Sequence, residues 1–135
     1  MRLVIDANIV FSSLVAGNIV DLIFSPKLEL IAPELLFVEM RKHKSELMGK
    51  SEFSEPEFEI LFSLLESRIK IIPLEEFIDL IPEAEKLLEK HIKDAPYLAL
   101  ALRFNCPFWS YEKRFKKIGK AESLNTKELV DLINI

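Results

Sequence analysis

Short apolar segments alternate with helix-like segments along almost the whole chain, and this alternation limits the possible folds more than any other feature. The apolar segments that resemble strands are residues 3–5, 28–32, 69–74, 107–111 and a short stretch before Asn125. Strands that alternate with helices are typical of parallel sheets covered by helices on both faces. The sequence therefore predicts an α/β fold, a three-layer sandwich with a central, mostly parallel sheet of four to five strands.

Prolines indicate where several of the helices begin. Pro33 and Pro56 each precede apolar residues at helical spacing, and the first turn of a helix tolerates proline because its N–H is not needed there. A clear helical periodicity runs from residue 88 to residue 102, but Pro96 lies within it. We therefore expect one helix to end, and another to begin, near Asp94.

The remaining connections have weaker patterns. Residues 18–24 and 82–88 are expected to form short helices, and residues 48–57 are the most loop-like part of the chain. Asn125 is followed three positions later by Glu128, as at the start of a helix closed by a capping box. A last helix is therefore predicted after Asn125.

The length and composition indicate one domain, residues 1–135. A chain of 135 residues, half of them hydrophobic, is large enough to bury a single core. Cys106 is the only cysteine, so no internal disulfide can form, and we expect it to be a buried residue rather than a nucleophile. No segment resembles a signal peptide or a membrane span. These features predict a soluble, cytoplasmic protein with no membrane partner.

The charge distribution argues against a general polyanion-binding protein. The formal net charge is -4, whereas non-specific binding to nucleic acids depends on Lys and Arg at phosphates. Two local basic clusters, residues 41–44 and 113–117, are exceptions to this net negative charge. Either cluster, considered alone, is explained by a solvated face. Any nucleic-acid site is therefore expected to be local.

Four acidic residues lie at the ends of the predicted elements. Asp6 follows the first strand, Glu39 lies in the helix after the second strand, Asp94 precedes a helix, and Glu112 follows the strand at 107–111. Each alone has a simpler explanation, because Asp6 and Asp94 are suited to capping helices and Glu39 to a solvated surface. A shared location would change this interpretation. Two carboxylates about 4 Å apart repel by roughly 4 kcal/mol at an effective dielectric constant near 20, so a cluster needs protons or a cation such as Mg²⁺.

The segments that carry these acids resemble a known family. "VIDANIV", "ELLFVEM", "KDAPYLALAL" and "FWSYEKRF", in this order and at these intervals, look like the four motif regions of the PIN-domain family, which includes the toxin nucleases of prokaryotic toxin–antitoxin pairs. The resemblance implies a ribonuclease that hydrolyses phosphodiester bonds of single-stranded RNA with Mg²⁺ or Mn²⁺. It also implies that Asp6, Glu39, Asp94 and Glu112 are the catalytic metal ligands.

The resemblance assigns supporting roles to neighbouring residues. Asn8 is expected to orient Asp6 or a water molecule, and Ser110 is the hydroxyl residue of the last motif. The family usually has Asp two positions after this hydroxyl, whereas this chain has Glu112, which places a second metal position and full activity in question. Lys113 and Arg114 are expected to contact phosphate. With one or two ions, water would attack phosphorus and leave a 5′ phosphate.

Two other functions remain open from the sequence. A PIN-like fold with a weakened last motif could be an RNA-binding or protein-binding module. Phosphoryl transfer through an aspartyl phosphate on Asp6 is also conceivable, but Asn8 interrupts the DxD pattern of such enzymes. The sequence gives neither the RNA target nor a cleavage motif.

An antitoxin and a second copy of the chain are the expected protein partners. Apolar residues from Phe53 to Leu65 would suit such an interface, although core packing explains them equally well. His43 and His91 lack the spacing of metal ligands and are expected on the surface.

Overall fold

Five parallel strands form the central sheet. The structure is a computed structural model that describes residues 1–134. The strand order is β3-β2-β1-β4-β5, and every neighbouring pair is parallel. The predicted α/β fold with a parallel sheet is therefore confirmed. The strands are β1 (Arg2–Ile5), β2 (Glu29–Pro33), β3 (Lys70–Ile72), β4 (Phe108–Trp109) and β5 (Ser123–Leu124).

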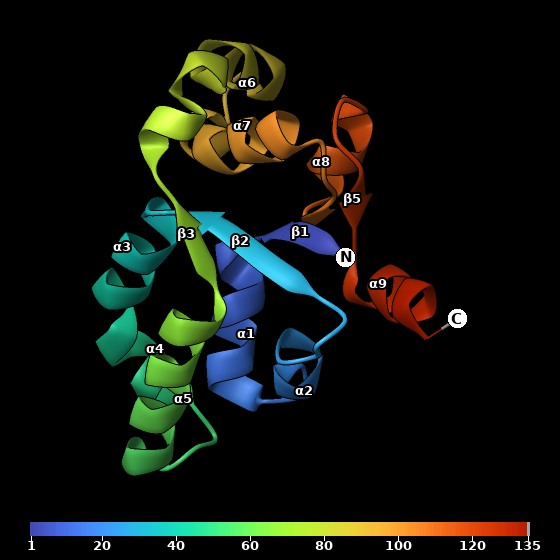
Figure 1. The fold of residues 1–135 in the computed structure, drawn as a ribbon. Coiled ribbons are helices and arrows are strands. Elements are labelled where there is room, and N and C mark those ends of the chain that lie inside the picture. Colours follow the sequence, from blue (N-terminus) through green and yellow to red (C-terminus); the bar gives the residue numbers. More distant parts are fainter. Residues whose placement is uncertain (135) are drawn as a thin grey trace.

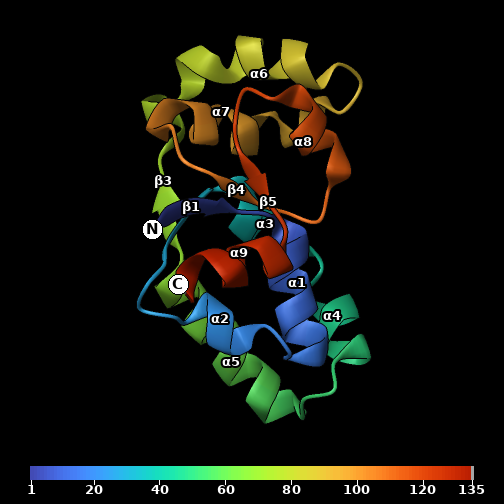
Figure 2. The ribbon, with the colours of Figure 1, turned by 90° about the vertical axis from the view of Figure 1, so that its right-hand side faces the viewer.

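Helices cover both faces of this sheet. α7 lies on one face with α6 packed outside it, whereas α1, α2, α5 and α9 lie on the opposite side (Figures 1 and 2). This arrangement is the predicted sandwich. The helices are α1 (Ala7–Ala16), α2 (Val20–Ile23), α3 (Leu35–Lys42), α4 (Lys44–Lys50), α5 (Glu55–Arg68), α6 (Ile81–Leu88), α7 (Ala95–Phe104), α8 (Lys113–Ile118) and α9 (Thr126–Ile133).

The core is centred on β1, which is buried on both faces. Leu3, Val4 and Ile5 are fully buried, and Val4 is paired with Ile31 of β2 on one side and Phe108 of β4 on the other. A strand covered on both faces needs continuous rather than alternating apolar residues, which explains the run at residues 3–5. Cys106 is buried, as predicted.

Several elements differ from the sequence-based expectation. The segment 48–57 is mostly helical: α4 continues to Lys50, and α5 begins after a capping box between Ser54 and Glu57. The basic cluster 113–117 lies within α8. The strand expected at residues 69–74 ends at Ile72, and two 3₁₀ turns, Leu74–Glu76 and Ile78–Leu80, follow it. The predicted capping box of Asn125 and Glu128 is present.

The apolar residues of α5 divide into a buried and an exposed set. Phe58, Phe62 and Leu65 are buried, so they belong to the core rather than to a surface. Ile60 and Leu64 are exposed on the other side of the helix. Within residues 1–134, no helix has the length and apolar character needed to cross a membrane.

The neighbouring strands β1 and β4 create the position at which a ligand is expected. β1 and β4 are neighbours although β2 and β3 lie between them in the chain, so the strand order reverses between β1 and β4. Open α/β sheets bind ligands beyond the carboxyl ends of strands at such a switch point. Asp6 and Ser110 directly follow β1 and β4.

Candidate active site

A hydrogen bond between Asp6 and Ser110 connects the carboxyl ends of β1 and β4. Asp6 is only 7% exposed, and the Ser110 hydroxyl donates a hydrogen bond to its Oδ2 over 2.7 Å. Ser110 is also buried, and its Oγ accepts a hydrogen bond from the backbone N–H of Glu112 over 3.0 Å. The hydroxyl thus fixes the carboxylate of Asp6 and the start of the following turn at the same time.

Three of the four candidate acids precede helices without capping them. Asp6, Asp94 and Glu112 are the N-cap residues of α1, α7 and α8, and none makes a side-chain capping hydrogen bond. The capping explanation for Asp6 and Asp94 is therefore wrong. Their carboxylates are available for other partners.

The pKa values of Asp6 and Glu39 are both raised, in part by the charges of other candidate acids. Burial raises the pKa of Asp6, and the charges of Asp94 and Glu112 raise it further, although the Ser110 hydrogen bond opposes this shift. Burial also raises the pKa of Glu39, with Asp6 and Asp94 as further causes. Asp94 and Glu112 thus lie within electrostatic range of Asp6, and Asp6 and Asp94 lie within electrostatic range of Glu39.

Tyr97 supports Glu39 and was not singled out from the sequence. It lies in the first turn of α7, is 2% exposed, and its hydroxyl donates to Glu39 Oε1 over 3.4 Å. Burial and then the neighbouring carboxylate of Glu39 raise the pKa of the Tyr97 phenol, so it remains a donor. Its place three residues after Asp94, at helical spacing, was the available sequence clue.

Arg114 lies among the acids rather than away from them. Its guanidinium pairs with Asp94 and also with Glu112 Oε2, the second pair at 3.0 Å. The expected phosphate contact thus has two carboxylate partners in this conformation. Lys113, the other expected phosphate contact, is exposed at the start of α8, and Asn8 is exposed in the first turn of α1.

The donor set suits a hard divalent cation in kind. All four candidate ligands are carboxylates; the pKa values of Asp6 and Glu39 are raised first by burial and then by neighbouring acids, whose charge a cation would offset. In the part of the chain that the structure describes, however, no three Asp, Glu, His or Cys side chains are already grouped closely enough to hold an ion. Arg114 holds two of the four carboxylates, so binding would require a local rearrangement.

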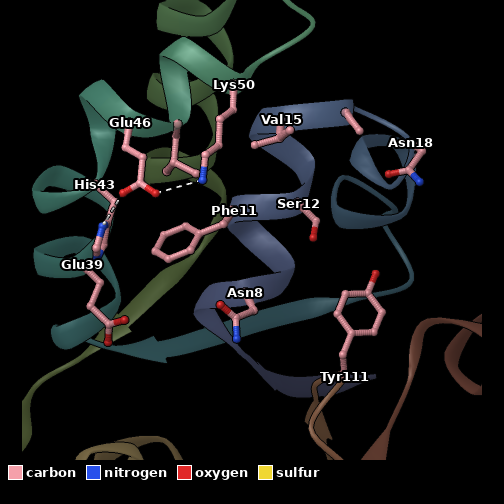
Figure 3. A pocket seen from close by; sticks show the side chains of 12 residues that line it. Asn8, Phe11, Ser12, Val15, Asn18, Glu39, His43, Glu46, Lys50 and Tyr111 are labelled. Atoms are coloured by element: carbon pink, nitrogen blue, oxygen red, sulfur yellow. Dashed lines mark hydrogen bonds and ion pairs between the residues drawn. The ribbon is translucent and has the colours of Figure 1, made fainter.

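Two grooves meet beside this acidic cluster, and Glu39 and His43 line both. The larger, of about 830 Å³, follows α1, and Figure 3 shows Asn8 between Glu39 and Tyr111. The Tyr111 hydroxyl accepts a hydrogen bond from Thr126 over 3.1 Å. The second groove, of about 570 Å³, includes Asp94 together with two exposed lysines, Lys42 and Lys93.

The parallel sheet, with Asp6 and Ser110 directly after the neighbouring strands β1 and β4, defines an α/β protein whose candidate ligand site is at the carboxyl ends of these strands. The chain belongs to the PIN domain family, whose sequence profile matches residues 4–132. Among curated proteins, no sequence matches this chain. A chain in the crystal structure of VapBC2 from Rickettsia felis, bound to a DNA fragment from their promoter, has the same fold. The TM-score is 0.64 at 16% identity, over 93% of this chain and 98% of that one.

Proposed function

We propose that this protein is a metal-dependent endoribonuclease that hydrolyses phosphodiester bonds of single-stranded RNA. One observation carries the proposal. The buried carboxylate of Asp6, which makes no capping hydrogen bond to α1, lies at the switch point within electrostatic range of Asp94 and Glu112. A buried carboxylate close to other acids costs stability, so a functional role accounts for Asp6 better than a structural one. Membership of the PIN domain family, whose members are typically nucleases, supports the same activity.

Asp6, Glu39, Asp94 and Glu112 would hold Mg²⁺ or Mn²⁺. The chemistry that such a cation supplies is stabilisation of negative charge on phosphate oxygens and activation of water. The chain itself fixes the carboxylates: Ser110 orients Asp6, and Tyr97 orients Glu39. Tyr97 and Ser110 are both buried, so both supports come from the interior of the fold rather than from exposed side chains.

The two grooves would carry the RNA on either side of the acids. Lys42 and Lys93 would contact phosphates in the smaller groove, and the exposed ring of Tyr111 would stack on a base in the larger one. Because both grooves reach Glu39, a strand could cross the site and continue in both directions. This path favours internal cleavage rather than removal of terminal nucleotides.

The test is cleavage of a mixed pool of end-labelled single-stranded RNAs with Mn²⁺, Mg²⁺ or a chelator. We expect the wild-type protein to cut in the presence of metal and Asp94→Asn to lose about two orders of magnitude or more of this activity while it remains folded. Asp131→Asn is the matched control, because Asp131 is an exposed acid on α9. Circular RNA as a second substrate separates internal from terminal cleavage.

Equal turnover by wild type and Asp94→Asn would contradict the assignment of the site. Absence of cleavage in every metal by folded protein would instead favour the alternative function, a PIN-fold module that binds RNA or protein without cutting. Two observations point to that alternative: Glu112 in the last motif and the pairing of Arg114 with Asp94 and Glu112.

We also propose that the protein acts as the toxin of a toxin–antitoxin pair, with an antitoxin as its partner. The support is the shared fold with a chain of the VapBC2 complex. If this role is correct, induced expression of the wild type in a bacterial host should arrest growth, and expression of Asp94→Asn to the same level should not. Equal growth with both proteins would argue instead for a processing nuclease.

A further inference from the structure

Arg114 occupies the position in which the proposed function requires a cation. Its two terminal nitrogens are directed at different acids: Nη2 pairs with Asp94 and Nη1 with Glu112. The side chains of Arg114, Asp94 and Glu112 are 30%, 21% and 36% exposed, so the ion pairs are only partly screened by water. The cluster of acids is therefore not purely negative, because Arg114 contributes one positive charge to it.

The guanidinium of Arg114 contacts neighbouring side chains, but its hydrogen-bonding capacity is not fully used. Its Cζ lies over the ring of Phe115, 5.2 Å from the ring centre, and among residues 1–134 its buried Nε has no hydrogen-bond partner. A hollow of about 370 Å³ adjoins Arg114 between the end of α6 and α8, where His91 and Ile118 also line it. Arg114 therefore has both an unmet hydrogen-bond donor and space into which it can move.

We propose that Arg114 and the divalent cation bind in competition at Asp94 and Glu112, so that metal binding releases the guanidinium toward the substrate phosphate. This inference rests on the proposed function and concerns the same site. A guanidinium and a divalent ion on the same carboxylate repel each other strongly where water is partly excluded. Once released, Arg114 presents a planar fork suited to two phosphate oxygens. The expected phosphate contact of Arg114 would thus exist only in the metal-loaded protein.

The first test is calorimetric titration with Mn²⁺ in the absence of RNA. Arg114→Gln should bind Mn²⁺ about tenfold more tightly than wild type, because no resident charge opposes the ion. Arg114→Lys retains a charge and should stay close to wild type. Lys120→Gln removes one exposed charge beyond the end of α8 and should change the affinity less than about twofold.

The second test follows Arg114 directly by NMR. The Nε–Hε resonance, assigned by its loss in Arg114→Lys, should shift during a Mg²⁺ titration along the same curve as metal binding. With Mn²⁺ at saturation, Arg114→Gln should raise KM for single-stranded RNA about tenfold and change kcat little. Far-ultraviolet circular dichroism establishes that each variant is folded.

Equal Mn²⁺ affinity in Arg114→Gln and Lys120→Gln would overturn the exchange, and so would an Arg114 resonance that does not respond to Mg²⁺. If the wild type still cleaves RNA only with metal, the proposed function survives this failure. If neither the wild type nor Arg114→Gln binds Mn²⁺, the exchange and metal dependence both fail.

Discussion

At Asp6, the proposed function requires a buried carboxylate whose charge lowers the stability of the fold. It is buried, accepts a hydrogen bond from Ser110, and lies near the charges of Asp94 and Glu112. Because burial and these charges raise its pKa, the native state binds the proton more tightly than the unfolded chain. Stability from this group is therefore present at low pH and is lost as the pH rises through its raised pKa.

We predict that Asp6→Asn raises the free energy of unfolding at neutral pH, because it removes a buried charge whose pKa is raised by burial and by the neighbouring acids. The variant keeps an oxygen that can accept from Ser110 but removes the buried charge. Urea denaturation with a chelator present checks this, and the difference from wild type should shrink as the pH falls toward 4. A variant that is less stable than wild type at neutral pH would contradict the electrostatic interpretation.

The sequence allowed the positions of these residues to be predicted, but not their partners. Asp6 and Asp94 could be placed because strand ends and helix starts follow from local patterns of apolar residues and proline. The pairing of Arg114 with Asp94 joins residues 20 positions apart and depends on how α8 packs against the start of α7. Local periodicity contains no information about that contact.

At the scale of elements, α8 is a helix that the sequence did not reveal, and α4 is one whose end the sequence placed too early; both have few apolar residues. α8 has the sequence KRFKKI, in which Phe115 is the buried residue, so the segment was interpreted as a charge cluster. In α4, Leu47 is the buried residue and Gly49 lies in the last turn. Packing against α1 and α3, rather than intrinsic propensity, stabilises α4. In contrast, α9 could be predicted because its capping box is encoded locally.

The end of α1 depends on a glycine that is constrained in two ways. Gly17 has φ +74°, and a Cβ atom there would lie 2.6 Å from Cζ of Phe53. Gly119, at the end of α8, has φ +70° but no atom within 4 Å of such a Cβ. The two positions therefore share a left-handed backbone conformation that would strain any other residue, and they differ in what a Cβ atom would contact.

We predict that Gly119→Ala lowers the free energy of unfolding by about 1 kcal/mol, the cost of a left-handed conformation for alanine. Gly17→Ala should cost about 1 kcal/mol more, because the ring of Phe53 must also move. Thermal and chemical denaturation of the two variants, measured side by side, gives this difference. Equal losses would mean that Phe53 yields without cost.

At the scale of the whole molecule, the sheet could be predicted more fully than the site. Five alternating strand and helix units leave few alternatives to a parallel sheet, and right-handed crossovers restrict its topology further. Convergence of the four acids, however, requires the order β3-β2-β1-β4-β5, which places β1 beside β4. That order was not predicted, because strand periodicity does not specify which strands are neighbours; the expectation that the acids share a site came only through the family resemblance.

Metal binding should be visible in the stability of the whole molecule. A ligand that binds only the native state at 100 times its Kd adds about 2.7 kcal/mol. We therefore predict that excess Mn²⁺ raises Tm by several degrees in the wild type and in Asp131→Asn, but by much less in Asp94→Asn. Differential scanning fluorimetry with and without chelator checks this. The same increase in Asp94→Asn would mean that Mn²⁺ binds elsewhere.

The hydrogen bond from Ser110 to Asp6 spans 104 positions of the chain. During translation a protein emerges N-terminal end first, so a partly synthesised chain contains Asp6 and Glu39 long before it contains Asp94, Ser110 or Glu112. β4, the strand that completes the site beside β1, is synthesised after β1, β2 and β3. If the proposed activity is correct, a nascent chain that has not yet reached β4 therefore cannot cut RNA, including the messenger RNA from which it is being made.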